Sequence, residues 1–150
     1  MKKILFICHG NICRSPMAEF VMKDLVRKAG LKDQFIIRSA ATSREEIGCD
    51  THPGTRRVLR SHGIAFAKRH AVQVTRSDYD AYDYLIVMDD NNLYNLRRII
   101  GQDTKHKVKK LLNFCGIDRD VADPWYTGDF ETTYADIDAG CKALLHSIEN

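Results

Sequence analysis

The sequence lacks a hydrophobic run that approaches the roughly 18 apolar residues needed to cross a membrane. Its first ten residues, MKKILFICHG, have an apolar part too short for a secretory signal. No run of lysine and arginine exceeds two residues, and the formal net charge is only +3. That charge suits an anionic substrate but is far from the basic excess of a nucleic-acid-binding protein. These absences predict a cytoplasmic protein that binds neither membranes nor nucleic acid.

The cysteines lack the pattern of a disulfide framework or a metal site. There are five, at irregularly spaced positions 8, 13, 49, 115 and 141. An odd number at irregular spacing fits a reducing compartment better than a set of structural disulfides. No Cys-x2-Cys pair is present, so a zinc site would have to combine Cys8, Cys13, Cys49 and His52, a spacing atypical of zinc.

The 150 residues suffice for one domain with a hydrophobic core but not comfortably for two, and no internal repeat interrupts them. Short apolar runs predict strands at 2–8, 34–40 and 83–88, with a fourth strand or its approach within 107–115. Helical periodicity predicts helices at 15–29, 53–62, 90–100 and 131–148. This alternation predicts a single doubly wound α/β domain over residues 1–150, with a four-stranded parallel sheet and helices on both faces.

The stretch CHGNICRS, residues 8–15, joins the first predicted strand to the first predicted helix. Unpaired N–H groups and the helix dipole make such a junction attractive to anions. Gly10 and Asn11 can adopt the positive φ values that fold N–H groups into a nest, and Arg14 adds a fork for two phosphate oxygens. The same field favours the thiolate of Cys8, which makes it a candidate nucleophile. An inert buried cysteine is the alternative for Cys8, and we expect Ser15 to cap the helix.

Attack of a thiolate on phosphorus expels an alkoxide or phenoxide that needs a proton, so the site requires a general acid. Asp123, in the stretch DPWY, is the best candidate. Trp125 and Tyr126 follow it and can form an aromatic wall for a ring-bearing substrate, although plain packing roles are the alternative. The other nearby carboxylates that spacing alone does not exclude are Asp118, Asp120 and Asp129.

The stretches CHGNICRSPMAE and DPWYTGDFE resemble the low-molecular-weight protein-tyrosine-phosphatase family, with support from SAATS, HPGT and YDYLIVMDDNN. The resemblance covers essentially the whole chain. It implies hydrolysis of phosphotyrosine in proteins, and of aryl phosphates, through a cysteinyl-phosphate, with Cys8 as nucleophile, Arg14 as phosphate-binding residue and Asp123 as general acid and base. It implies no metal or cofactor, and inorganic phosphate or a similar oxyanion would occupy the loop. We expect a monomer or weak dimer.

The resemblance also assigns supporting roles. Asn11 and Ser15 match residues that hold the loop and the thiolate, and Ser39 matches a partner of Asn11. Cys13 matches a second loop cysteine that forms a reversible disulfide with Cys8 and shields it from irreversible oxidation, and packing is its alternative. The remaining loop residues, which the resemblance places around the phosphate, are His9, Gly10 and Ile12.

Three departures from the family pattern affect the predicted substrate site. Glu45, followed by Glu46, replaces the usual aromatic residue two positions after the serine matching Ser43, so one wall of the cleft is expected to be acidic. An acidic wall would favour a basic flank on the substrate or lower the affinity for phosphotyrosine. Trp125 replaces a tyrosine and keeps an aromatic wall. Val72 stands where the family often has the arginine of His-x-Ala-Arg-Gln.

Four other functions use related features. A protein-arginine phosphatase of the same fold typically has a threonine where this chain has Ile12, so Ile12 favours phosphotyrosine, while Glu45 keeps that alternative open. An arsenate reductase on this fold needs two further cysteines near the third strand, and residues 78–95 contain none. A sugar-uptake phosphocarrier would not need Arg14 and Asp123 together. A phosphate-binding module without activity would show a decayed nucleophile or acid.

Overall fold

The computed structural model describes residues 1–149 and centres on a parallel sheet of four strands in the order β2-β1-β3-β4. The strands are β1 (Lys2–Cys8), β2 (Phe35–Ala41), β3 (Tyr84–Val87) and β4 (Val108–Lys110). Alternate residues of β1 point to opposite faces: Ile4 and Phe6 belong to one buried cluster, Leu5 and Ile7 to another. Both faces are therefore buried, as the run of apolar residues in this strand predicts.

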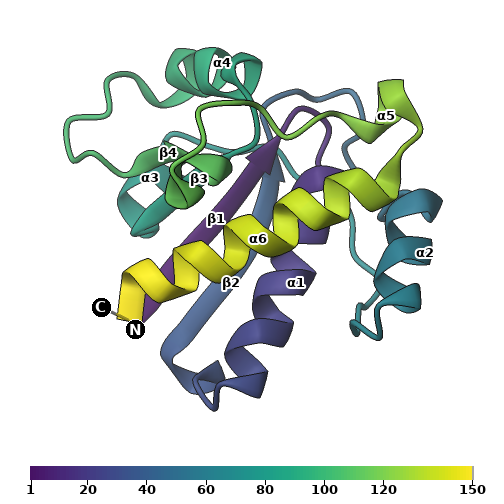
Figure 1. Cartoon of the computed structure of the whole chain (residues 1–150). Coiled ribbons are helices and arrows are strands. Elements are labelled where there is room, and N and C mark those ends of the chain that lie inside the picture. The colour runs from purple at the N-terminus through teal and green to yellow at the C-terminus, as the bar shows by residue number, and fades with distance from the viewer. Residues whose placement is uncertain (150) are drawn as a thin grey trace.

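Helices cover both faces (Figure 1). On one side lie α1 (Arg14–Lys28) and α6 (Phe130–Glu149), with α2 (Pro53–Ser61) packed against them. On the other side lie α3 (Asp78–Ala81) and α4 (Asp90–Ile100). The predicted α/β domain with a four-stranded parallel sheet is confirmed. Among residues 1–149, no helix is both long and apolar enough to cross a membrane.

The carboxyl end of β1 lies at the centre of the sheet, between β2 and β3. The chain leaves this strand toward β2 on one side and returns through β3 on the other, so a crevice opens where the strand order reverses. Ligands bind at this point in open α/β sheets. Cys8 is the last residue of β1 and therefore stands at the crevice.

Three details differ from the prediction. Only residues 108–110 of the predicted 107–115 segment form a strand, and the chain then turns into the 3₁₀ helix η2 (Leu111–Cys115). The turn buries Leu111 against α6, where an added Cβ on Gly140 would lie 2.4 Å from the Leu111 side chain. Three short helices also form that the sequence pattern did not predict, namely η1 (Lys32–Gln34), α3 and α5 (Pro124–Thr127).

The predicted cap of α1 is wrong. The helix begins at Arg14 with Cys13 as N-cap and has no side-chain cap. Ser15 lies inside the first turn, and its hydroxyl contacts Asn11 and Cys8 instead of the helix end. The hydrogen-bond network of the loop therefore uses the Ser15 side chain that local propensity predicts as a helix cap.

Candidate active site

The β1–α1 loop, residues 8–15, is held by a chain of buried side-chain hydrogen bonds. Asn11 is fully buried, and its Nδ2 donates to Ser15 Oγ at 2.7 Å and to Ser39 Oγ at 2.9 Å. Ser39 Oγ in turn donates to Glu19 Oε1 in α1 at 2.6 Å. The network joins the loop to β2 and to the first helix, so its shape is fixed from both sides.

The hydroxyl and the backbone N–H of Ser15 both contact the sulfur of Cys8. Its Oγ lies 3.1 Å from Cys8 Sγ, and its backbone N–H donates to the same sulfur at 3.5 Å. Ser15 Oγ accepts a hydrogen bond from Asn11 Nδ2, and its own hydroxyl hydrogen can be donated to a thiolate at Cys8. Two donors therefore face the sulfur, an arrangement that suits a thiolate.

Asn11 takes the left-handed conformation, with a φ of 59°. Its Oδ1 accepts from Arg69 Nη2 at 2.5 Å and from the Val72 backbone N–H at 3.2 Å, so both ends of the amide are satisfied. Gly10 does not share the positive φ that the sequence predicted. A Cβ on Gly10 would instead lie 3.3 Å from Glu46 Cγ. The close packing of the Glu46 side chain against the backbone therefore explains this glycine better than its backbone angle.

Arg14 projects from the first residue of α1 and is 3% exposed in its side chain. Its Nη1 donates to Asp89 Oδ2 at 2.7 Å and to the Val121 carbonyl at 2.8 Å, while Nη2 lies 3.4 Å from Asp123 Oδ2. Burial opposes the positive charge, but Cys8, Asp89 and Asp123 together raise the pKa of the guanidinium above its ordinary value. The arginine is a fixed cation at the base of the site.

Asp123 reaches the same site from the other end of the chain. It is the N-cap of α5, and its Oδ1 accepts from the Trp125 N–H at 3.0 Å. Pro124 at the first helical position suits this cap because proline has no N–H to leave unpaired. The second carboxyl oxygen faces Arg14, and 26% of the side chain is exposed.

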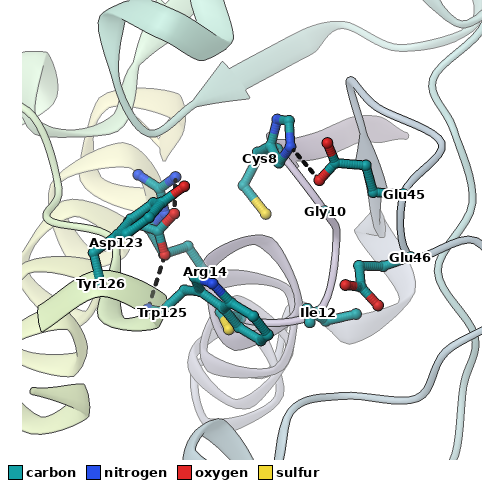
Figure 2. A pocket seen from close by; sticks show the side chains of 11 residues that line it. Cys8, Gly10, Ile12, Arg14, Glu45, Glu46, Asp123, Trp125 and Tyr126 are labelled. Carbon is teal, nitrogen blue, oxygen red and sulfur yellow. Dashed lines mark hydrogen bonds and ion pairs between the residues drawn. The ribbon is translucent and has the colours of Figure 1, made fainter. Parts of the chain in front are cut away.

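These groups line one cavity of about 110 Å³ (Figure 2). Figure 2 shows Asp123, Trp125 and Tyr126 on one side of Cys8, and Glu45 and Glu46 on the other. Both aromatic rings are exposed, Trp125 by 58% and Tyr126 by 85%. The remaining lining residues of the predicted site are His9, Gly10, Ile12, Cys13 and Arg14.

The acidic side of the cavity is attached to the β1–α1 loop. Glu45 Oε2 lies 2.9 Å from His9 Nε2, and Glu46 Oε2 lies 3.5 Å from the exposed Cys49 thiol. Glu45 remains 69% exposed in its side chain, so its carboxylate faces solvent at the cavity mouth. The wall predicted to be acidic does contain two carboxylates.

All five cysteines are free, and Cys13 lines the cavity with Cys8. Burial, followed by the neighbouring charges of Cys8 and Asp123, raises the pKa of the Cys13 thiol to about 12. Among residues 1–149 there is no group of three or more His, Cys, Asp or Glu side chains that could hold a metal ion. The zinc combination weighed from the sequence does not assemble within this range.

Comparison with known proteins shows the family to which the chain belongs. The family model for low molecular weight phosphotyrosine protein phosphatase matches residues 3–150. The chain belongs to this family. The low molecular weight protein-tyrosine-phosphatase YfkJ of Bacillus subtilis (strain 168) is 42% identical over 151 residues, covering 99% of this chain and 97% of that protein. The crystal structure of YfkJ matches with a TM-score of 0.95 and 43% identity over 99% of this chain and 95% of that one.

Other relatives of this low molecular weight phosphatase extend to animals. The low molecular weight phosphotyrosine protein phosphatase of Gallus gallus is 39% identical, covering 97% of this chain and 94% of that protein. A solved drosophila arginine phosphatase is 28% identical with a TM-score of 0.89, covering 100% of this chain and 99% of that one. The family model and the relatives from Bacillus subtilis and Gallus gallus are named as tyrosine phosphatases, and the chain is accordingly an enzyme of this class, a hydrolase.

Two contacts in the active site of this phosphatase were missed from the sequence. Asp89 accepts a hydrogen bond from Arg14. It follows the third strand and so lies at the same edge of the sheet as Cys8, and this position in the sequence could have indicated a role in the site. Arg69, which binds Asn11, lies three residues before Val72, the position at which the family arginine was sought. An arginine therefore lies near this loop, although not at the position that the family pattern gave.

Proposed function

We propose that the protein hydrolyses phosphotyrosine in proteins, and aryl phosphates, through a cysteinyl-phosphate on Cys8. The observation that carries this proposal is that Cys8, Arg14 and Asp123 line one cavity although 109 residues separate Arg14 from Asp123. A nucleophile, a cation for the phosphate and an acid for the leaving group are the three parts that this reaction needs.

In the first step, Cys8 Sγ attacks phosphorus and forms the S–P bond as the P–O bond to the leaving group breaks. Asp123, in its protonated form, gives its proton to the departing oxygen. The phosphoryl oxygens lie among the N–H groups of the β1–α1 loop and the guanidinium of Arg14, which stabilise the charge that develops on them. Ser15 holds the thiolate before attack and after release.

In the second step, Asp123 is a carboxylate and takes a proton from water as the water oxygen attacks phosphorus. The S–P bond breaks, inorganic phosphate leaves, and Cys8 returns to the thiolate. Asp123 therefore acts first as acid and then as base, and its 26% exposure gives water access to it.

The substrate ring would lie between Trp125 and Tyr126 on one side and Ile12 on the other. All three line the cavity, and the exposed rings offer an apolar surface at its mouth. Glu45 and Glu46 would then face residues that flank the phosphotyrosine in the substrate protein.

Asp123→Ala tests the assignment of the acid. Loss of general-acid catalysis should lower kcat/KM for phenyl phosphate by about 10²- to 10⁴-fold, and much less for an aryl phosphate whose leaving group needs no proton. Steady-state kinetics on both substrates checks this. An equal loss on both substrates would reject Asp123 as the acid.

A protein-arginine phosphatase is the second candidate, because a solved arginine phosphatase shares the fold at 28% identity. Ile12 favours phosphotyrosine, since its apolar side chain lines the cavity. Wild type should hydrolyse phosphotyrosine peptides in preference to matched phosphoarginine peptides, and Ile12→Thr should reduce that preference. Glu45→Trp, which restores an aromatic wall, should raise activity on phosphotyrosine. A preference of the wild type for phosphoarginine would reject the proposed substrate but keep the cysteine mechanism.

A further inference from the structure

Lys110, the last residue of β4, is 8% exposed in its side chain and lies among three carboxylates. Its Nζ is 2.8 Å from Asp120 Oδ1 and 3.1 Å from Asp90 Oδ1, with Asp118 Oδ1 more distant at 3.8 Å. The hydrogen bond to Asp120 is the first of the contacts that raise the pKa of Lys110, so the ammonium stays charged at neutral pH.

The two close carboxylates each lie next in sequence to a residue that contacts Arg14, Asp90 to Asp89 and Asp120 to Val121. Asp90 is the first residue of α4 and follows Asp89, which holds Arg14. Asp120 lies three residues before Asp123, in the 116–123 segment that leads from η2 to α5. The Asp90 N–H also donates to Asp120 Oδ1 at 3.2 Å, so Lys110 closes a link between α4 and the 116–123 segment.

The 116–123 segment has other anchors as well: Arg14 Nη1 donates to the Val121 carbonyl at 2.8 Å, Thr133 Oγ1 donates to the Ala122 carbonyl at 3.0 Å, and the Val121 side chain is buried in the core. The Val121 N–H donates to the Met88 carbonyl at 2.9 Å, and Arg119 makes two contacts of 2.8 Å with Asp136 of α6. Without the ammonium, the carboxylates of Asp90 and Asp120 would face each other with no cation between them. Their repulsion would push Asp120 away from α4 and thereby shift Asp123 at the end of the segment.

We propose that Lys110 is a positioning residue for Asp123, acting through Asp120 to hold the 116–123 segment at the distance from Cys8 that proton transfer requires. The inference rests on the proposed function, in which Asp123 is the general acid. A displaced Asp123 slows both steps in which it transfers a proton, because transfer requires hydrogen-bond reach, and kcat/KM reports the first of them, in which the leaving group is protonated. Arg14 keeps its contact with Asp89, whose own position is set by the capping box of α4.

Lys110→Met, which keeps the length of the side chain without its charge, is the first test. The kcat/KM for phenyl phosphate should fall by about tenfold, and that for an aryl phosphate with a good leaving group by less than about threefold. Inhibition by inorganic phosphate should change by less than about twofold, because Arg14 remains in place. Lys109→Met, at the exposed neighbouring position, is the matched control and should behave as wild type.

Two further variants keep the inference falsifiable if Lys110→Met unfolds. Lys110→Arg should restore the acid-dependent rate, and Asp120→Asn should reproduce the leaving-group-dependent loss. In an Asp123→Ala background, Lys110→Met should change kcat/KM by less than about twofold, because the acid that it positions is gone. Equal losses on both substrates, or a full further loss in that background, would overturn the inference. Failure of Asp123→Ala to discriminate between leaving groups would instead overturn the proposed function.

Discussion

The β1–α1 loop and the 116–123 segment meet at one cavity, but they are held there by different kinds of contact. The loop is fixed by hydrogen bonds through the buried amide of Asn11, one of them from the guanidinium of Arg69. The segment is held by hydrogen bonds to the backbone of Val121 and Ala122 and, in addition, by charged contacts through Lys110 and Arg119. Buried networks hold a single geometry, whereas exposed ion pairs are weak and screened by salt. The cavity thus combines a rigid nucleophile with an acid whose position depends in part on charged contacts.

Asn11→Ala should have the largest effect because it breaks the rigid side. It leaves Ser39, Arg69 and the Val72 N–H without their partner and puts alanine at a φ of 59°. We expect the free energy of unfolding to fall by about 2–4 kcal/mol and kcat/KM to fall on all substrates alike. Urea denaturation and aryl phosphate kinetics measure both, with the exposed Asn91→Ala as control. A loss confined to poor leaving groups would contradict the division between the two regions.

The double variant Glu45→Gln, Glu46→Gln should have an intermediate effect on activity. It tests what the acidic wall contributes to substrate choice beside the aromatic wall. In wild type, phosphotyrosine peptides with lysine beside the phosphotyrosine should be preferred over glutamate-flanked peptides by about fivefold at low salt. The double variant should lose most of that preference, and 0.5 M salt should weaken it in wild type. Glu131→Gln, an exposed carboxylate outside the cavity, controls for net charge. An unchanged preference in the double variant would show that the acidic wall does not select the flank.

Replacing Cys13 should have the smallest effect on turnover. It should change how Cys8 responds to oxidation. Peroxide converts the Cys8 thiolate to a sulfenic acid, and attack by the Cys13 sulfur would form a disulfide and release water. The pKa of Cys13 is raised to about 12, so its thiolate is scarce at pH 7 and increases about tenfold per pH unit below that pKa. Mass spectrometry after mild peroxide should find more Cys8–Cys13 disulfide, relative to irreversibly oxidised Cys8, at pH 9 than at pH 7. Cys13→Ser should show only irreversible oxidation; equal recovery by dithiothreitol in that variant would count against the redox role.

The difference between the two regions also explains what could be predicted. Cys8, Asn11 and Arg14 lie within seven residues, so the end of the strand, the loop and the start of the helix could be predicted together from the sequence. Asp123 was found through the chemistry that the loop needs and through the family motif. Asp89, Arg69 and Lys110 were not found, because their partners lie far away in the sequence and only the packed sheet brings them together.

The wrong details have the same origin. Ser15 satisfies every local rule for a helix cap, yet its hydroxyl is taken by Asn11 and Cys8. The 107–115 segment has the apolar pattern of a strand, yet contact with α6 turns its second half into η2. In both cases tertiary contacts override a local preference, as they do wherever burial outweighs propensity.

The most direct test of the cysteinyl-phosphate mechanism is to trap the intermediate. Asp123→Ala should still form the phosphoenzyme from an aryl phosphate with a good leaving group but should hydrolyse it slowly, because the base for water attack is missing. Acid quenching followed by mass spectrometry of peptides should locate one phosphoryl group on Cys8, and Cys8→Ser in the same background should carry none. A phosphoryl group on another residue, or wild-type turnover in Cys8→Ser, would contradict the mechanism.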